Sequence, residues 1–420
     1  MAEVSGAKRL GRLILIGTGF MAITMVWQIY TAYLPLFYHD LVRLEAVTGF
    51  IIGADNLLGK FVQPWIGAMS DSTSTRLGRR VPFLLVGAPL AAIFISLIPL
   101  AVGWGLLPLI VTASCLNLAM AVAQSPTVAL MPDVTPSHQR SSANGIISLM
   151  GGIGAVIAYF YGGKLYQAGH SYPFLLVGGM LLVVTLIFAT LVRERQWALT
   201  VPMEAAPAHA RTGFWASLKQ AAGVTADLLR SRDVSAIGLF LAIFVWSVGY
   251  QAVETWFTTF ATQVLGVSRG EAALSLAFTA GAVVLTAVPA GYLARLIGRR
   301  WTIRLGLLGL IALMLAMGRV SSLGTLRIML ALVGVSWALV TINAYPMVVD
   351  LVSDRLTGVY TGLYYVFSGL ATLVGPLLFG ILLDLGGNRA LFPGTAACML
   401  VALGLFWPVN RGEARPADGT

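Results

Sequence analysis

Polar side chains recur at helical intervals inside an apolar stretch of the sequence around residue 60. Asn56, Lys60, Gln63 and Gly67 are separated by four, three and four residues, so a helix carries them on one face. Amide and ammonium groups are costly in an apolar environment unless they contact a partner or a water-filled cavity. This face therefore predicts a polar cavity whose amides hydrogen-bond a polar solute.

A second stripe combines aromatic rings with a carboxylate. Trp246, Tyr250 and Glu254 follow one another at intervals of four residues, and Gln251 lies three residues before Glu254. Sugars suit such a surface, because their C–H faces stack on aromatic rings while their hydroxyl groups hydrogen-bond to carboxylates and amides. Simple hydration of Glu254, which lies toward the outer half of its apolar stretch, is the alternative interpretation.

Other polar and aromatic residues inside apolar stretches are candidates for the same cavity. Aromatic side chains in such stretches often contact lipid or lie at the membrane interface, so we expect about half of these tyrosines and tryptophans to miss the solute. The candidate binding residues are Trp27, Gln28, Tyr30, Asn56, Gln63, Asn117, Gln124, Tyr250, Gln251, Glu254, Trp337, Asn343 and Tyr364.

Two acidic residues, Asp55 and Glu254, lie well inside apolar stretches and are the candidates for proton coupling. A carboxyl group in a low-dielectric cavity takes up and releases protons near neutral pH. Asp55 lies about 140° from Lys60 around a helix, so each is expected to find its counter-charge on another helix. We favour Asp55 as the coupling residue because it is nearer the middle of its stretch.

The composition requires membrane-spanning helices to position these residues. Hydrophobic residues make up 58% of the chain and charged residues 10%, and the mean hydropathy is +0.84. A bilayer core of about 30 Å takes roughly 20 apolar residues as helix, and continuous rather than alternating apolar runs exclude strands. The twelve predicted spans are residues 13–37, 47–69, 83–103, 106–131, 143–166, 172–192, 234–261, 271–294, 301–319, 324–349, 357–383 and 390–409. The length of the first run favours a retained span over a cleaved signal peptide.

The spans divide into two sets of six around the polar stretch 193–233. We therefore predict an all-α membrane protein with an N-terminal bundle at 1–192, a cytoplasmic linker at 193–233 and a C-terminal bundle at 234–420. Part of the linker, Phe214 to Leu229, has apolar residues at helical spacing and is a candidate for a helix on the membrane surface. Of the 27 lysines and arginines, 20 fall on the side of the termini and six on the other side. Both termini are thus predicted to be cytoplasmic, in a plasma membrane of the bacterial inner-membrane type.

A charged loop occurs at matching places in the two halves. In each copy, a glycine is followed four residues later by a charged residue, Asp71 or Arg295, and then by Gly-Arg-Arg at 78–80 or 298–300. The ends of the fourth and tenth spans also correspond, because Asp133 and Asp350 each precede a glycine by twelve residues. Matching landmarks in the same order indicate an internal duplication, as in many membrane transporters.

The loops are expected to act in gating. Arginines at a helix end neutralise the negative carboxyl termini of neighbouring helices and pair with carboxylates. We expect Asp71, Arg79 and Arg80 to clasp against the other half, with Asp133 a candidate partner in their own half, and these contacts to break when the cytoplasmic side opens. A purely topological role is the alternative for the arginines. The gating candidates are Asp71, Arg76, Arg79, Arg80, Asp133, Arg140, Arg299, Arg300 and Asp350.

These motifs resemble the major facilitator superfamily over essentially the whole chain. More narrowly, Ser70-Asp71 followed by Arg76-Leu77-Gly78-Arg79-Arg80-Val81-Pro82-Phe83 is similar to the sucrose/proton symporters, which are allied to the glycoside-pentoside-hexuronide cation symporters. Supporting stretches are QPWIGAMSD, RSSANGI, YPMVVD and YTGLYY. The resemblance implies alternating access between two six-helix bundles. The sodium-site carboxylates of the melibiose-type relatives align with Gly59 and Gln63, which are not acidic, so the comparison favours protons over sodium.

The expected function is secondary active transport, most simply proton-coupled symport of a disaccharide or glycoside such as sucrose. Proton-coupled efflux of drugs or other small amphiphiles on the same fold is the second hypothesis, and a membrane enzyme or non-transporting sensor is the third. The sequence lacks His-Glu-x-x-His, Gly-x-Ser-x-Gly and Gly-x-x-x-x-Gly-Lys-Ser/Thr motifs, so an enzyme and an ATP-driven pump are disfavoured. We expect no cofactor or metal, a transmembrane proton gradient as energy source, no nucleic acid partner, and a monomer in the lipid bilayer.

Overall fold

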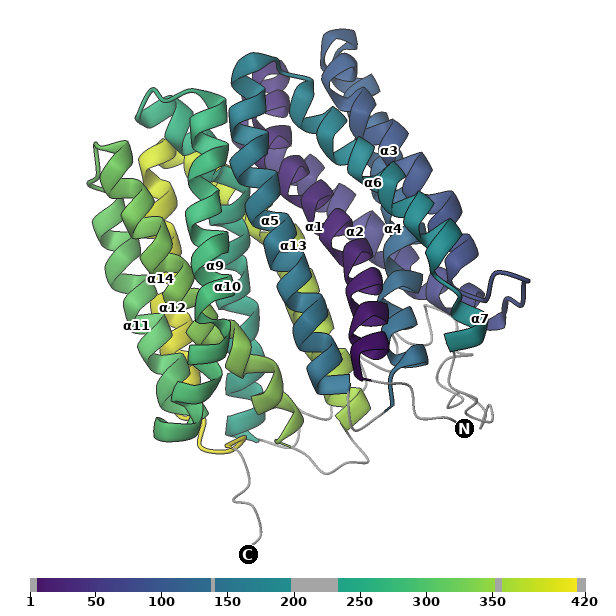
Figure 1. The fold of residues 1–420 in the computed structure, drawn as a ribbon. Helices are drawn as coiled ribbons and strands as arrows, with labels where there is room; N and C mark the ends of the chain where they lie inside the picture. Colours follow the sequence, from purple (N-terminus) through teal and green to yellow (C-terminus); the bar gives the residue numbers. More distant parts are fainter. Residues whose placement is uncertain (1–5, 137–139, 198–232, 352–356, 414–420) are drawn as a thin grey trace, which may run out of the picture. The chain divides into compact units, whose positions relative to one another are not determined.

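The computed structural model describes residues 6–136, 140–197, 233–351 and 357–413. The first set of long helices comprises α1 Gly6–Val42, α2 Glu45–Ser72, α3 Val81–Trp104, α4 Leu106–Val134, α5 Arg140–Ala168 and α6 Tyr172–Leu191. The second comprises α9 Val234–Val264, α10 Arg269–Ile297, α11 Arg299–Met317, α12 Leu323–Val349, α13 Thr357–Gly386 and α14 Leu391–Phe406. Two short helices, α7 Glu194–Trp197 and η3 Asn388–Ala390, complete the described elements. Within these residues the predicted helical membrane fold is confirmed, with no strand (Figure 1).

Eleven of the twelve long helices are apolar enough, within the described residues, to qualify as membrane spans on hydropathy and length. The exception is α2, which carries Asp55, Asn56, Lys60 and Gln63 in its middle. The polar stripe from which the sequence predicts a binding role for α2 is thus also what lowers its hydropathy. Many large apolar side chains elsewhere face outward, among them Leu107, Leu285 and Val288, as expected for helices surrounded by lipid.

Helix ends follow local sequence signals. Asp233 caps α9 by accepting the backbone N–H groups of Ser235 and Ala236 at 3.1 and 3.2 Å. Ser268 caps α10 by accepting the N–H of Glu271 at 3.2 Å, which is the spacing of a capping box.

The described residues fall into two compact units by their internal packing. Unit 1 contains the described parts of Met1–Phe37 and Leu58–Trp215, and unit 2 contains those of Tyr38–Leu57 and Ala216–Thr420. This grouping differs from the predicted bundles at one described segment, Tyr38–Leu57, which comprises the end of α1, the turn and the first half of α2. That segment packs in unit 2 because Gly49 and Gly53 of α2 bring its backbone against Pro376 and Leu373 of α13.

Each unit has a core of helices held close by small residues. In unit 1, α3 packs beside α4 and α6, with Gly87 against the backbone of α4 and Gly178 against that of α3. In unit 2, α12 packs beside α10 and α11, with Gly334 against the Thr279 carbonyl and Gly306 against that of Ser336. Close backbone approach of this kind is typical of helices that associate in lipid.

Most of the predicted linker, residues 198–232, lies outside the described residues, and with it the candidate surface helix Phe214 to Leu229. Its first residues are described. They form α7, which contacts α4 in unit 1 and carries a buried glutamate, Glu194.

Candidate functional site

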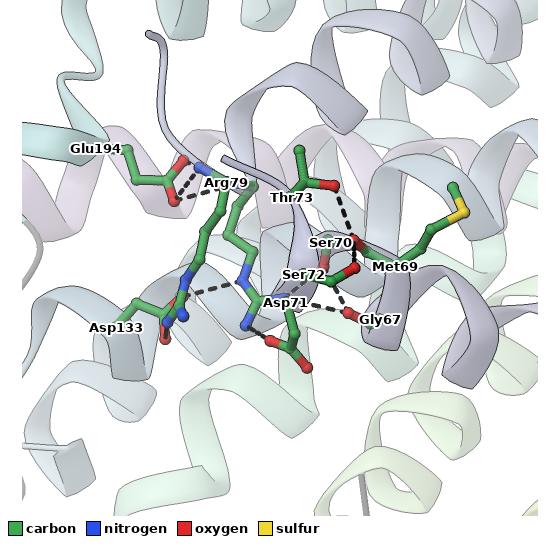
Figure 2. Close-up of polar contacts among 10 residues, drawn as sticks. Gly67, Met69, Ser70, Asp71, Ser72, Thr73, Arg79, Asp133 and Glu194 are labelled. Carbon is green, nitrogen blue, oxygen red and sulfur yellow. Dashed lines mark hydrogen bonds and ion pairs between the residues drawn. The ribbon is translucent and has the colours of Figure 1, made fainter. Parts of the chain in front are cut away.

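The first arginine cluster consists of Arg79, Arg80, Asp71, Asp133 and Glu194, all in unit 1 (Figure 2). Arg79 donates to Asp133 through two nitrogens, at 2.6 and 3.2 Å, and Arg80 donates to the same carboxylate at 3.0 Å. A second nitrogen of the Arg80 guanidinium, Nη2, pairs with Asp71. Arg80 is only 7% exposed, so its charge depends on these two carboxylates.

Glu194 completes this cluster from α7. Its carboxylate accepts the backbone N–H groups of Arg79, Arg80 and Val81 at 2.9 to 3.1 Å. Helix α3 begins at Val81, and the first N–H groups of a helix have no partner within it. Glu194 therefore caps α3 and also places a negative charge at the positive end of the helix.

The second arginine cluster repeats this arrangement in unit 2 with Arg299, Arg300, Asp350 and Glu413. Arg299 pairs with Asp350. Glu413 accepts the backbone N–H groups of Arg299 and Arg300 at 2.7 and 3.0 Å and pairs with the Arg300 Nε at 2.9 Å. Each Gly-Arg-Arg motif thus meets an aspartate at the end of the fourth helix of its set and a glutamate that follows the sixth.

The contacts with Arg299 and Arg300 lower the pKa of Glu413, which lies beyond the end of α14. Burial acts to raise the pKa of Glu413, but the hydrogen bonds from Arg300 and Arg299 outweigh it, so the pKa lies below its usual value. The carboxylate is therefore the form that the folded protein favours.

Each motif requires a glycine at its first position, because the backbone has a positive φ and the glutamate lies close to it. Gly78 and Gly298 have φ of +116° and +86°, which side-chain-bearing residues rarely adopt. A Cβ on Gly78 would lie 2.3 Å from a Glu194 carboxylate oxygen, and one on Gly298 would lie 3.1 Å from Glu413.

We predict that Gly78→Ala lowers the apparent melting temperature more than Gly298→Ala does. Both substitutions place a Cβ at positive φ, costing about 1 kcal/mol or more, but only the first also displaces a buried carboxylate. Thermal unfolding of the purified full-length protein measures the difference. Gly179→Ala, in α6 with no atom within 4 Å of the added carbon, is the control. Equal melting temperatures for Gly78→Ala and Gly179→Ala would contradict the prediction.

Side-chain hydrogen bonds join candidate binding residues of unit 1 at three places. The Trp27 indole N–H donates to Gln124 at 3.1 Å, and the Gln63 amide reaches the same oxygen at 3.5 Å. The buried Asn117 donates to the Tyr30 hydroxyl at 3.3 Å. The third contact joins Gln28 with Tyr159, a residue on α5 that sequence reasoning missed. The structure thus brings six predicted residues into direct side-chain pairs.

Unit 2 brings together other members of the predicted site. The rings of Tyr250 and Trp337 stack with centroids 4.0 Å apart and planes 2° from parallel. Glu254, one turn further along α9, lies within electrostatic reach of Tyr250. Gln251 contacts the backbone of α13 at Gly375.

The remaining candidates of unit 2 are less closely joined. Asn343 is buried and donates to the Leu339 carbonyl of its own helix at 2.9 Å. Tyr364 packs edge-on against Tyr345. Asn56 and the 5% exposed Asp55 also belong to unit 2, whereas Gln63, further along α2, belongs to unit 1.

The aromatic stripe predicted on α9 is divided. Trp246 is 2% exposed and packs against Phe406 of α14, with the ring centroids 6.2 Å apart. Tyr250 instead stacks on Trp337 of α12. Residues four apart share a helix face only approximately, and here two neighbouring helices divide that face. Among the gating candidates, Arg76 is exposed, and the side chain of Arg140 lies outside the described residues.

The sequence of the chain matches a known protein family. The sequence profile of the family described as MFS/sugar transport protein matches residues 15–398. The chain belongs to this family. It is therefore a multi-pass membrane protein of a transporter family and not of an enzyme family, as its sequence predicts.

Sequence relatives of the transporter include sugar carriers at low identity. Sucrose transport protein SUC3 of Arabidopsis thaliana is 27% identical over 183 residues, 39% of this chain and 31% of the relative. Proton-associated sugar transporter A of Homo sapiens is 35% identical over 121 residues, 26% of this chain and 16% of the relative. The matched segments thus span about a third or less of these relatives.

Solved structures share the fold of the transporter. A bacterial homolog of the human lysosomal transporter Spinster has a TM-score of 0.76 at 17% identity, covering 99% of this chain and 100% of its own. The D-xylose-proton symporter has a TM-score of 0.71 at 14% identity, covering 95% and 98%. At these identities the likeness establishes the major facilitator fold alone.

Glu194 and Glu413, like Tyr159, are residues of the candidate sites that sequence reasoning missed. A signal was present for the two glutamates, since each is an acid within two residues of an arginine just after the sixth or twelfth apolar run, in Arg193-Glu194-Arg195 and Arg411-Gly412-Glu413. The segments differ in spacing and composition, so only the structure shows that both cap an arginine motif.

Proposed function

We propose that the protein is a proton-coupled symporter of a sugar, with a disaccharide or glycoside such as sucrose as the substrate class. The observation that carries the proposal is Asp55, an acid with 5% exposure in the middle of the polar helix α2. An ionisable group buried in a membrane helix is costly to retain without a function, and a carboxyl group serves to bind and release a proton. Gly59 and Gln63 align with the sodium-site carboxylates of the melibiose-type symporters. Neither residue is acidic, which favours protons over sodium as the coupling ion.

The sugar part of the proposal is supported by the family, by its sucrose-transporting relatives, and by the side chains around the spans. Stacked Tyr250 and Trp337 offer ring surface for the C–H faces of a sugar, with Glu254 close by as a hydrogen-bond acceptor. In unit 1, Trp27, Gln63 and Gln124 offer further amide and indole groups.

A thermal-shift screen of mono- and disaccharides on the purified protein identifies the substrate. A ligand that binds the native state stabilises it by mass action, so a substrate raises the melting temperature in a concentration-dependent way. The responding sugar is then offered to proteoliposomes with an inward proton gradient. Accumulation that a protonophore abolishes supports symport, whereas proton-driven extrusion of the same compound would replace the proposal with efflux.

We predict that Asp55→Asn abolishes sugar accumulation against a gradient while sugar exchange continues. Asparagine keeps the shape of the side chain but cannot change charge, so the carrier can alternate with sugar bound but cannot couple to protons. Accumulation and counterflow in proteoliposomes measure the two activities separately. Asp55→Glu, which keeps a carboxyl group, is the control and should retain accumulation. Wild-type accumulation by Asp55→Asn would refute the coupling role.

A further inference from the structure

A line of buried polar groups on α2 connects Asp55 with one end of the spans. Glu45, Thr48 and Asp55 are separated by three and seven residues and lie within about 80° of one another around the helix. Each is no more than 5% exposed. This end of α2 is opposite to the end followed by the first arginine cluster, because α2 runs from Glu45 to Ser72.

At the Glu45 end, the line of buried polar groups meets a polar cluster within unit 2. His39, at the end of α1, lies 2.9 Å from the Glu45 carboxylate, and its other ring nitrogen lies 2.6 Å from the Gln263 amide. His39 is partly exposed, whereas Glu45 is buried behind it. The charged groups around this pair are Asp40, which binds Arg269 of α10 at 2.7 Å, and Asp384 of α13.

Asp384 holds the first turn of α2, at the Glu45 end of the line, in position. Its carboxylate accepts the backbone N–H groups of Glu45 and Ala46 at 2.9 and 2.8 Å, capping the first turn of α2. The Glu45 side chain is thereby held at the helix end, where it contacts His39. One carboxylate oxygen of Glu45 is buried without a hydrogen-bond partner among the described residues.

Hydroxyl groups along the line have no protein partner in the described part of the chain. Other buried threonine hydroxyls donate to a carbonyl one turn earlier, as Thr302 does at 2.8 Å and Thr395 at 2.9 Å. The fully buried hydroxyls of Thr48 and Tyr38 have no hydrogen-bond partner in the described part of the chain. The same holds for Thr259, one turn from Gln263 on α9. A buried hydroxyl without a partner is costly, so groups of this kind indicate hydration or proton exchange.

Tyr38 lies between the polar cluster at Glu45 and the other end of the line at Asp55. It lies on α1 next to His39 and is within electrostatic reach of Asp55. Thr48 and Asp55 are seven residues apart, or about 10 Å along the helix, so solvent water must bridge the hydroxyl groups.

We propose that His39, Glu45, Thr48 and Tyr38 form the route by which protons reach Asp55 from the end of the spans opposite the arginine clusters. The inference rests on the proposed proton coupling at Asp55. A proton taken up by the Glu45 carboxylate passes through water and the Thr48 and Tyr38 hydroxyls. Each oxygen gains one proton and releases another, and the last O–H bond forms on the Asp55 carboxylate. Chains of acids, histidines and hydroxyls in membrane helices serve as such relays.

Time-resolved infrared spectroscopy tests the route without knowledge of the sugar. Full-length protein in nanodiscs is subjected to a downward pH jump, and the carbonyl band of a protonated carboxyl group is followed. The band that Asp55→Asn removes belongs to Asp55. We expect Glu45→Gln, Thr48→Val and Tyr38→Phe each to slow its appearance by about tenfold. Thr395→Val is the matched control, because this buried hydroxyl bonds to the Leu391 carbonyl and lies on α14.

The outcomes separate the route from the function on which it rests. If Asp55→Asn removes no band, Asp55 does not take up a proton, and both the coupling site and the route are refuted. If the band belongs to Asp55 but appears at the wild-type rate in all three relay variants, the route is refuted and the proposed function stands. Misfolding cannot imitate the expected result, since an unfolded chain exposes Asp55 to water and speeds its protonation.

Discussion

Glu194→Ala is expected to destabilise the protein and to impair transport more than any other single substitution in the arginine clusters. The change leaves three backbone N–H groups without their acceptor, those of Arg79, Arg80 and Val81. It also removes a carboxylate that is 2% exposed from beside two arginines. Leaving a buried donor without its acceptor costs about 1–3 kcal/mol, and more when the hydrogen bond involves a charged group.

Thermal unfolding and sugar counterflow of Glu194→Ala measure the two effects. The neighbouring Arg195 is exposed, so Arg195→Ala is the control and should behave like the wild-type protein. Indistinguishable melting temperatures for the two variants would show that the cap contributes nothing to stability.

The related substitution Glu413→Ala should have a smaller effect that depends on pH. Glu413 is about one-third exposed, so solvent screens its contacts. Its pKa in the folded protein lies below the ordinary value of 4.5, so its stabilising contribution is complete above that pH. The contribution is lost as the pH falls through the folded-state pKa, and the melting temperatures of Glu413→Ala and wild type should converge there.

Trp337→Ala is expected to weaken sugar binding by about thirtyfold, which corresponds to about 2 kcal/mol. The indole is held parallel to the Tyr250 ring at 4.0 Å, so its removal deletes ring surface and also frees Tyr250 to move. Equilibrium binding of the sugar found in the screen measures the change.

Trp246→Phe is the control for this experiment. Trp246 is also a buried tryptophan of unit 2, but it packs against Phe406 and does not join the Tyr250 stack. Its substitution should lower the melting temperature with little change in affinity. An unaltered affinity in Trp337→Ala would place the sugar elsewhere.

The helices were predictable because lipid imposes a simple requirement on the chain. A continuous apolar run must form a helix to satisfy its backbone, so run boundaries approximate helix boundaries. The predicted span 83–103 corresponds to α3 Val81–Trp104, and 324–349 corresponds to α12 Leu323–Val349. Helix α2 was predicted in the same way, from the run 47–69, although polar residues occupy one of its faces.

Side-chain partners were less predictable, because helical periodicity identifies a face but not the helix packed against it. The matched aspartates Asp133 and Asp350 were recognisable from the duplication, and both meet arginines of their own unit. Tyr159 carried no comparable signal. The division of Trp246 and Tyr250 between α14 and α12 likewise depends on helix packing, which the local sequence does not specify.

The position of the two capping glutamates determines where the polypeptide can be divided for expression as two fragments. A first fragment that ends with α6 at Leu191 would lack Glu194, the acceptor for the start of α3, whereas one extended through Trp197 would retain it. A second fragment requires Glu413, seven residues beyond α14, for the same reason. Fragment boundaries and affinity-tag junctions should therefore be chosen by these hydrogen bonds and not by the last residue of each apolar helix.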